Sequence, residues 1–300
     1  MPMKLQKFET DEQLKIERIM YTRRYSLTLD KRRCVVCELC ETVCPREAIH
    51  VVKPEDGEQA PPKLEIDVEL CQYCGICNAI CPFGALELKI NGEKTIPVVK
   101  FESFPQLIRD IKIDAEKCPV GCTVCMDTCP LKLITVKVVD EEGRPVENVD
   151  LYPEKERLKV TVEIEKEYCP VCRLCEYKCP YDAIHTQKII YGHISVKNEL
   201  CPEGCRECVE ACPIPEALQI SEDGRVVASD LFCVYCGACR IVCPVEGAIS
   251  LERTVIRHTP VHSGAWNKAL EKLTSTKGMA KELRSRALIK VKESVERRLA

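Results

Sequence analysis

The chain has 300 residues, a formal net charge of −3 and 45% hydrophobic residues, but only 5% of its residues are aromatic and it has a single tryptophan. Its 24 cysteines inflate the hydrophobic figure, so ordinary core side chains are scarce and the fold needs another source of cohesion. No uninterrupted apolar run has membrane-spanning length, which argues against an integral membrane protein.

The first segment, residues 1–25, is polar and charged, and it has neither the apolar core nor the small-residue cleavage site of an export signal. We therefore predict a cytoplasmic protein, in which cysteines bind metal and do not form disulfides. Residues 1–25 are assigned as an N-terminal arm.

Six copies of one cysteine signature follow, each with four cysteines and then a proline, and no cysteine is left over. In chain order, copies one to six are Cys34, Cys37, Cys40, Cys44 with Pro45; Cys71, Cys74, Cys77, Cys81 with Pro82; Cys118, Cys122, Cys125, Cys129 with Pro130; Cys169, Cys172, Cys175, Cys179 with Pro180; Cys201, Cys205, Cys208, Cys212 with Pro213; and Cys233, Cys236, Cys239, Cys243 with Pro244. Four copies have the run C-x2-C-x2-C-x3-C-P, which is typical of iron bound in 4Fe-4S clusters. Structural zinc generally uses two well-separated cysteine pairs, which this compact run does not resemble.

Copies three and five hold one extra residue, in Cys118-Pro-Val-Gly-Cys122 and Cys201-Pro-Glu-Gly-Cys205. A glycine before the second cysteine can adopt a positive φ and absorb the insertion. All four thiolates survive, so these copies are also assigned 4Fe-4S clusters. The proline that ends every copy stops a short helix and turns the chain.

Short segments with alternating apolar and polar residues flank the copies and predict half-buried strands in small antiparallel ribbons. They are residues 26–30, 63–67, 109–114, 158–164, 193–196 and 225–228. After each proline an apolar pair marks a further strand or a contact that covers the cluster: Ala48-Ile49, Ala85-Leu86, Leu133-Ile134, Ala183-Ile184, Ala217-Leu218 and Ala248-Ile249. Residues 140–157 are polar and rich in turn formers, which predicts a hairpin insertion.

Beyond the last copy, residues 265–273 and 279–299 have helical spacing and more basic than acidic side chains. Two interpretations stay open: a helix that packs on the chain's own domains, or a docking arm for another subunit with Trp266 as its anchor. We assign residues 259–300 as a helical docking tail. The histidines are interpreted as surface or capping residues, because cysteine alone completes every cluster: His50, His185, His193, His258 and His262.

No catalytic constellation is present: the chain lacks a G-x-G-x-x-G dinucleotide fingerprint and a phosphate-cradling loop. The chain is therefore expected to be no enzyme by itself. Ligated cysteines are thiolates, so six 4Fe-4S sites would take the formal net charge from −3 to about −15. Such a charge argues against nucleic acid as a partner.

The order strand, cysteine loop, short helix, strand resembles the bacterial-type two-cluster ferredoxin fold, repeated in tandem. The resemblance implies an α+β fold of three two-cluster ferredoxin domains over residues 26–97, 98–189 and 190–258, made of short antiparallel ribbons and short helices, followed by the helical tail. Pairing copy one with two, three with four and five with six leaves no copy without a partner. Spacing alone also permits copy four to pair with copy five, and a nested arrangement stays open.

The resemblance further implies six ligand sets, in each of which the fourth cysteine comes from the partner copy. Set 1 is Cys34, Cys37, Cys40 and Cys81; set 2 is Cys71, Cys74, Cys77 and Cys44; set 3 is Cys118, Cys122, Cys125 and Cys179; set 4 is Cys169, Cys172, Cys175 and Cys129; set 5 is Cys201, Cys205, Cys208 and Cys243; set 6 is Cys233, Cys236, Cys239 and Cys212.

Six clusters in one chain suit electron transfer between fixed partners, and domains in series would lengthen the path. The ensemble resembles the archaeal polyferredoxins of methanogenesis, and residues 255–270 with the C-P-x-G-C copies resemble the polyferredoxin subunit of formylmethanofuran dehydrogenase. This resemblance implies six 4Fe-4S clusters, electron delivery to a tungsten or molybdenum enzyme that reduces carbon dioxide onto methanofuran, and protein partners that include its catalytic subunits and a heterodisulfide reductase complex. The alternatives are a polyferredoxin of a nickel–iron hydrogenase, a structural hub stapled by clusters, and iron or electron storage.

Overall fold

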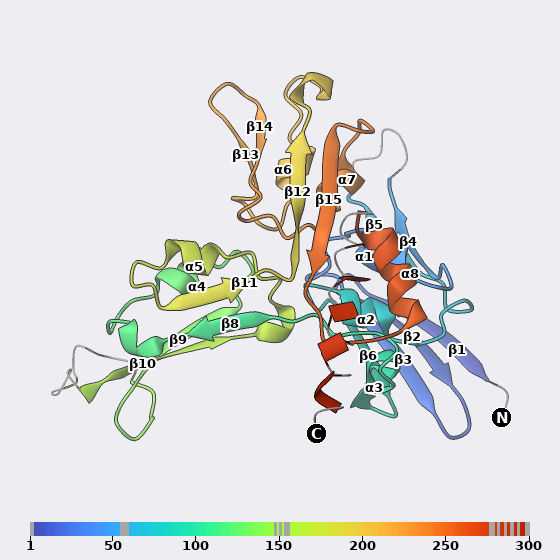
Figure 1. The fold of residues 1–300 in the computed structure, drawn as a ribbon, viewed down its shortest axis with the longest axis horizontal. Helices are drawn as coiled ribbons and strands as arrows, with labels where there is room; N and C mark the ends of the chain where they lie inside the picture. Colours follow the sequence, from blue (N-terminus) through green and yellow to red (C-terminus); the bar gives the residue numbers. More distant parts are fainter. Residues whose placement is uncertain are drawn as a thin grey trace.

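The computed structural model describes residues 3–54, 60–146, 149, 152 and 157–275, and in the tail residues 280, 283–284, 287–288, 291–292 and 295–297. Short strands and shorter helices alternate along the chain and gather into three lobes (Figure 1). Within the described residues, no helix combines the length and the apolar content needed to cross a membrane.

Each cysteine copy carries one short helix over its third cysteine. The six helices are α1 (Leu39–Val43), α2 (Ile76–Ile80), α4 (Val124–Thr128), α5 (Leu174–Lys178), α6 (Glu207–Glu210) and α7 (Ala238–Val242). They end at or just before the fourth cysteine, because the following proline disfavours helical geometry for the residue that precedes it. Three 3-10 turns, Ala115–Lys117, Lys166–Tyr168 and Asn198–Leu200, lead into copies three, four and five.

The six expected strands before the copies are present, with ends shifted by a few residues. They are β3 (Arg24–Asp30), β5 (Lys63–Ile66), β8 (Asp110–Ile113), β10 (Lys159–Ile164), β12 (Ile190–Val196) and β14 (Val226–Ala228). Each apolar pair after a proline also leads into a strand: β4 (Ile49–Val52), β6 (Leu86–Ile90), β9 (Ile134–Val139), β11 (Ile184–Gln187), β13 (Leu218–Ile220) and β15 (Ile249–Ile256).

Strand pairing brings the copies together two by two. The antiparallel pairs are β3 with β6 and β4 with β5, β8 with β11 and β9 with β10, and β12 with β15 and β13 with β14. In each lobe, the strand before the odd copy therefore pairs with the strand after the even copy. We call these lobes the first unit (copies one and two), the second unit (copies three and four) and the third unit (copies five and six).

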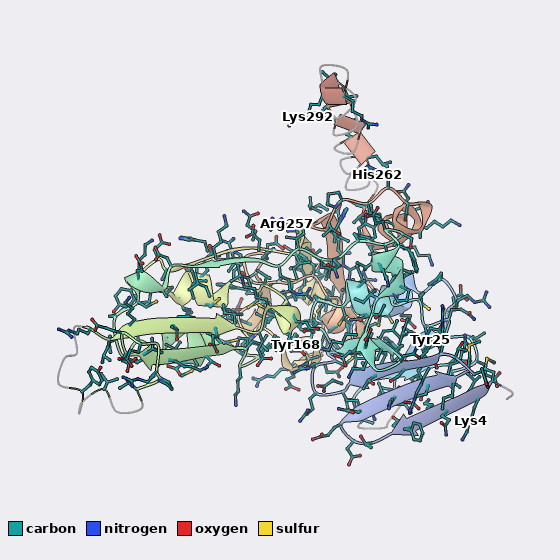
Figure 2. All side chains as sticks on the ribbon, turned by 90° about the horizontal axis from the view of Figure 1, so that it is seen from below. Lys4, Tyr25, Tyr168, Arg257, His262 and Lys292 are labelled. Carbon is teal, nitrogen blue, oxygen red and sulfur yellow. The ribbon has the colours of Figure 1, made fainter. Side chains whose placement is uncertain are left out.

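The N-terminal residues form part of the first unit and are not a separate arm, so that expectation was wrong. Strands β1 (Lys4–Glu9) and β2 (Gln13–Ile19) extend the ribbon of β3 and β6, and β7 (Glu93–Lys94) completes a five-stranded sheet. Leu14 and Ile16 are fully buried, and the carboxylate of Glu17 is buried between Lys15 and Arg24. Figure 2 shows the N-terminal strands of this sheet side by side, with Lys4 at its outer edge.

Trp266 is fully buried within its own chain, so its expected role as the anchor of a docking arm was wrong. Helix α8 (Gly264–Leu273) begins after Ser263, whose Oγ accepts the N–H of Trp266 at 3.1 Å. The indole packs edge-on against Phe104 and donates from Nε1 to Nε2 of His258 at 3.1 Å. Helix α8 thereby lies against α1 of the first unit. Helix α3 (Pro97–Lys100) lies in the link that leads from the first unit to Phe104.

Two other expected segments fall partly outside the described residues. In the expected hairpin over residues 140–157, Asp140 accepts the N–H groups of Glu142 and Arg144 and so forms a turn, but residues 147–148, 150–151 and 153–156 lie outside the described residues. In the tail, Leu288 and Val291 are exposed, and Lys292 lies well away from the three units (Figure 2).

Replacing the buried tryptophan tests this account of the C-terminal segment. We expect Trp266→Ala to destabilise the protein by about 3–5 kcal/mol, because it removes the large side chain that α8 buries against Phe104 and His258. Leu288→Ala, at a position that is 71% exposed, should change stability by less than about 0.5 kcal/mol. Anaerobic thermal unfolding of the holo protein measures both, and equal effects would contradict the structure.

Candidate metal centres

Four pockets of the structure are each lined by four cysteine side chains. Sets 1, 2, 4 and 5 each line one pocket with all four cysteines. The four pockets have similar volumes of 330–410 Å³, which include the space at the openings to solvent. In set 3, burial raises the pKa of Cys118, and the thiols of Cys179 and Cys122 raise it as well. In set 6, burial raises the pKa of Cys239, and the other three thiols of the set add to that effect.

The surroundings of these thiols disfavour the thiolate form when no metal is bound. Burial, with the neighbouring thiols of the same set adding to it, raises the pKa of Cys34 and of Cys208 to about 11 and that of Cys175 to about 12. Four thiolates side by side therefore require a compensating cation, and metal ligation is the reaction that displaces such protons. Within the described residues, no group of three or more Cys, His, Asp or Glu side chains is close enough to hold a single metal ion. Each of the four pockets offers four cysteines, which is the number of thiolates that a 4Fe-4S cluster takes.

One backbone feature recurs in all six loops: the residue before the second cysteine has a left-handed conformation. These residues are Val36, Tyr73, Gly121, Val171, Gly204 and Tyr235. The two inserted glycines thus take the positive φ that the sequence predicts, +91° and +72°. Valine is strained in this region, and such strain concentrates at functional sites. The left-handed conformation turns the backbone N–H of this residue toward the first thiol of the loop. An example is the N–H of Tyr235, which donates to Sγ of Cys233 at 3.4 Å.

In copies one to four, the fourth cysteine also accepts a hydrogen bond from the backbone further along the chain. There the N–H four residues further on donates to Sγ, at 3.3–3.4 Å, from Ala48, Ala85, Leu133 and Ala183. Copies five and six have one more residue between the proline and the apolar pair. Their fourth thiols instead contact the carbonyls of Ile214 and Val245. Nothing in the cysteine spacing signals this difference, whereas the longer interval after the proline does.

The loops differ in how well the chain itself covers them. In copies three and five, the C-P-x-G-C segments are exposed between their cysteines. In copy six, residues 232–239 are all buried, and in copy two Gly75, Ile76 and Cys77 are buried. Copy two is also covered by Arg18, which donates to the carbonyl of Cys71 at 2.7 Å and lies 5.0 Å from the ring centroid of Tyr73. Hence the two loops with an inserted glycine are the two that face solvent most openly.

Three of the histidines have defined partners in the chain. Nδ1 of His193 is 2.6 Å from a carboxylate oxygen of Asp230, Nδ1 of His185 is 3.8 Å from one of Asp182, and His258 accepts from Trp266. His50, His185 and His262 are exposed.

Comparison with known proteins agrees with this site. A family model described as a 4Fe-4S dicluster domain matches residues 33–85. An uncharacterised ferredoxin of Methanocaldococcus jannaschii is 42% identical over 60 residues, which are 20% of this chain and 94% of that protein. The polyferredoxin-like subunit of an aliphatic sulfonate oxidoreductase of Pyrococcus furiosus is 32% identical over 105 residues, 30% of this chain and 56% of that one.

A solved structure matches nearly the whole chain. It is a chain of the formate dehydrogenase–heterodisulfide reductase–formylmethanofuran dehydrogenase complex from Methanospirillum hungatei, with 31% identity, a TM-score of 0.77, and coverage of 91% of this chain and 92% of that one. The fold and the thiol sets define an iron–sulfur protein of the ferredoxin class. More particularly, the chain belongs to the 4Fe-4S ferredoxin family as a polyferredoxin, and its role is electron transfer.

The left-handed glycines offer a test of the loop geometry. Gly121 and Gly264 both face open space where a Cβ would be placed, but only Gly121 has a positive φ. We expect Gly121→Ala to destabilise the holo protein by about 1 kcal/mol through backbone strain alone. Gly264→Ala, in the first turn of α8, should be neutral or stabilising by up to about 1 kcal/mol. The readout is anaerobic thermal unfolding, and an unchanged Gly121→Ala variant would contradict the loop conformation.

Proposed function

We propose that this chain carries six 4Fe-4S clusters, one in each of sets 1 to 6, within three two-cluster domains. The domains span residues 26–97, 98–189 and 190–258, and residues 4–19 join the first. The pairing of strands two copies at a time and the crossing of every fourth thiol to the partner copy support this assignment.

We further propose that the chain delivers electrons to a formylmethanofuran dehydrogenase complex in carbon dioxide-reducing methanogenesis. The observation that carries this proposal is the match over 91% of the chain, at 31% identity, to a chain of an assembly that contains that enzyme. The relative from the aliphatic sulfonate oxidoreductase supports it less, because that match covers 30% of this chain.

In this function the clusters supply one-electron storage at low potential. The chain itself performs the other tasks. Its buried loops exclude water, and its backbone N–H groups donate to the sulfurs, which lowers the energy of added negative charge. The open loops of copies three and five are the places where a partner's redox centre can approach a thiol set most closely.

Partner identity is tested in the source organism. We expect the chain, tagged at its chromosomal locus and isolated without oxygen, to co-purify with the catalytic subunits of formylmethanofuran dehydrogenase, as identified by mass spectrometry. The reason is that an electron carrier with fixed partners is held in a stable assembly. Recovery of hydrogenase subunits alone would contradict the proposal, as would isolation of the chain without any stoichiometric partner.

A further inference from the structure

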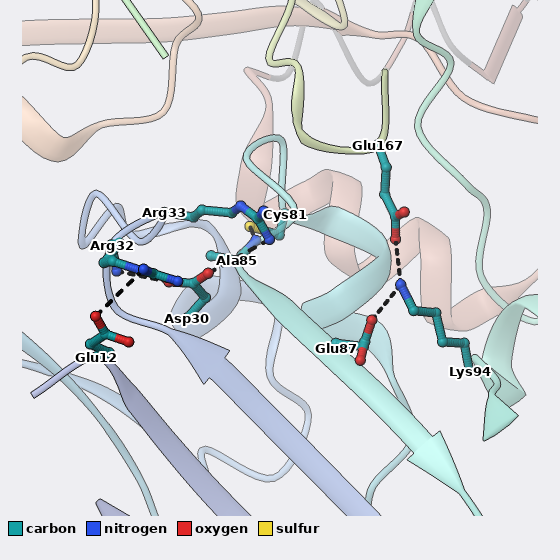
Figure 3. A network of polar contacts seen from close by, with 9 residues as sticks. All are labelled: Glu12, Asp30, Arg32, Arg33, Cys81, Ala85, Glu87, Lys94 and Glu167. Carbon is teal, nitrogen blue, oxygen red and sulfur yellow. Dashed lines mark hydrogen bonds and ion pairs between the residues drawn. The ribbon is translucent and has the colours of Figure 1, made fainter. Parts of the chain in front are cut away.

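At the contact between the first and second units, one guanidinium group bridges two thiol sets. Nη2 of Arg109 donates to the carbonyls of Cys81 at 3.0 Å and Pro82 at 3.2 Å, and its Nε donates to the carbonyl of Cys169 at 3.2 Å. Cys81 belongs to set 1 and Cys169 to set 4. One positive charge therefore lies between two thiol sets of different units. Around it, Lys94 of the first unit pairs with Glu167 of the second at 3.6 Å (Figure 3).

The first and third units meet at a second cation. Arg253 is only 5% exposed, and it donates to the carbonyl of Cys236 in set 6 at 3.1 Å and to Oε1 of Glu38 at 2.7 Å. Glu38 directly follows Cys37 of set 1. Sets 1 and 6 are thus neighbours across this contact.

The second and third units meet at a third cation. Lys188 is 3% exposed, its Nζ donates to the carbonyls of Asp230 and of Cys233 in set 6, the latter at 2.7 Å, and it lies 5.0 Å from the ring centroid of Tyr235. Beside it, Tyr177, two residues after Cys175 of set 4, packs edge-on against Phe232, the residue before Cys233 of set 6, with ring centroids 5.3 Å apart. Each of the three contacts between units therefore holds a cation beside the thiol sets that meet there: Arg253 and Lys188 are buried and Arg109 is half-buried.

We propose that sets 1, 4 and 6 form a three-way electron junction, and that Arg109, Arg253 and Lys188 are positioning residues that set the relative potentials of the centres in it. This inference rests on the proposed presence of six clusters. It replaces the expected series of domains with a branched path, in which sets 2, 3 and 5 lie on three separate arms. Two arms end in the open loops of copies three and five, and the third is covered by Arg18.

The physical reason is charge. Each step moves one electron and no atom or proton, so one site gains the negative charge that its neighbour loses. Sites of like charge repel in a poorly solvated interior, and a buried cation between them stabilises the added electron on either side. Counter-ions cannot replace this effect, because salt screens buried charges far less than exposed ones.

Charge-removing variants of the full-length holo protein test the proposal. Arg109→Gln and Lys188→Met remove one junction cation each. The control, Arg257→Gln, removes an arginine that pairs with Asp110 at 3.2 Å between the second and third units, the two units that Lys188 also joins, but that touches no cysteine. The readout is EPR during stepwise reduction with dithionite, together with iron per chain. The comparison is made at the potential where the first EPR signal of the wild type reaches half of its full amplitude. At that potential the junction variants should give a signal roughly fivefold smaller. The reason is that removal of a nearby unit charge changes the ratio of reduced to oxidised centre about tenfold or more. Arg257→Gln should match the wild type.

The possible results distinguish a failure of the proposed function from a failure of the junction proposal alone. If the wild type binds no iron, the proposed function fails and takes the junction with it. If the variants bind iron normally and their reduction curves coincide with that of the wild type, the junction alone is overturned. Arg109→Lys and Lys188→Arg keep the charge and should restore the wild-type curve. Loss of iron from both charge-removing variants would also overturn the proposal, because it would show that these cations hold the fold and do not tune it.

Discussion

The structure depends on bringing four mutually repelling thiolates to one place. Burial alone opposes this strongly, as the raised pKa of Cys34 and Cys175 indicates, and we propose that an iron core supplies the opposite charge that the fold needs. In the proposed ligand sets, the fourth thiol comes from the partner copy, so that each core crosslinks the two halves of a unit. Such crosslinks would hold together a chain with few aromatic side chains and with strands only two to eight residues long.

The same electrostatics organise the molecule at a larger scale. Negative sites cannot be packed together without cations between them, and the three contacts between units hold Arg109, Arg253 and Lys188 at these points. The cysteine loops differ in their exposure to solvent. The N-terminal strands and Arg18 cover the loop of copy two, whereas the C-P-x-G-C loops of copies three and five are exposed. Electron transfer between proteins requires inner sites that are shielded from water and outer sites that partners can approach.

Much of this was predictable from the sequence, because the pattern is local. The period-two segments and the apolar pair after each proline indicated all twelve strands that flank the copies, and the inserted glycines indicated the left-handed residue before the second cysteine. The alternation in residues 13–19 held the same kind of signal for β2, but it was interpreted as an arm. The burial of Trp266 and the bridge from Arg253 to Glu38 could not be predicted, because they join segments up to 215 residues apart with no pattern that links them.

The central claim is that the twenty-four thiols bind iron cubes and that these cubes hold the chain together. Quantification of iron, acid-labile sulfide and zinc in protein isolated anaerobically tests it most directly. The account predicts about 24 irons and about 24 sulfides per chain, without zinc. Stoichiometric zinc, or a well-folded chain with only a few irons, would contradict it.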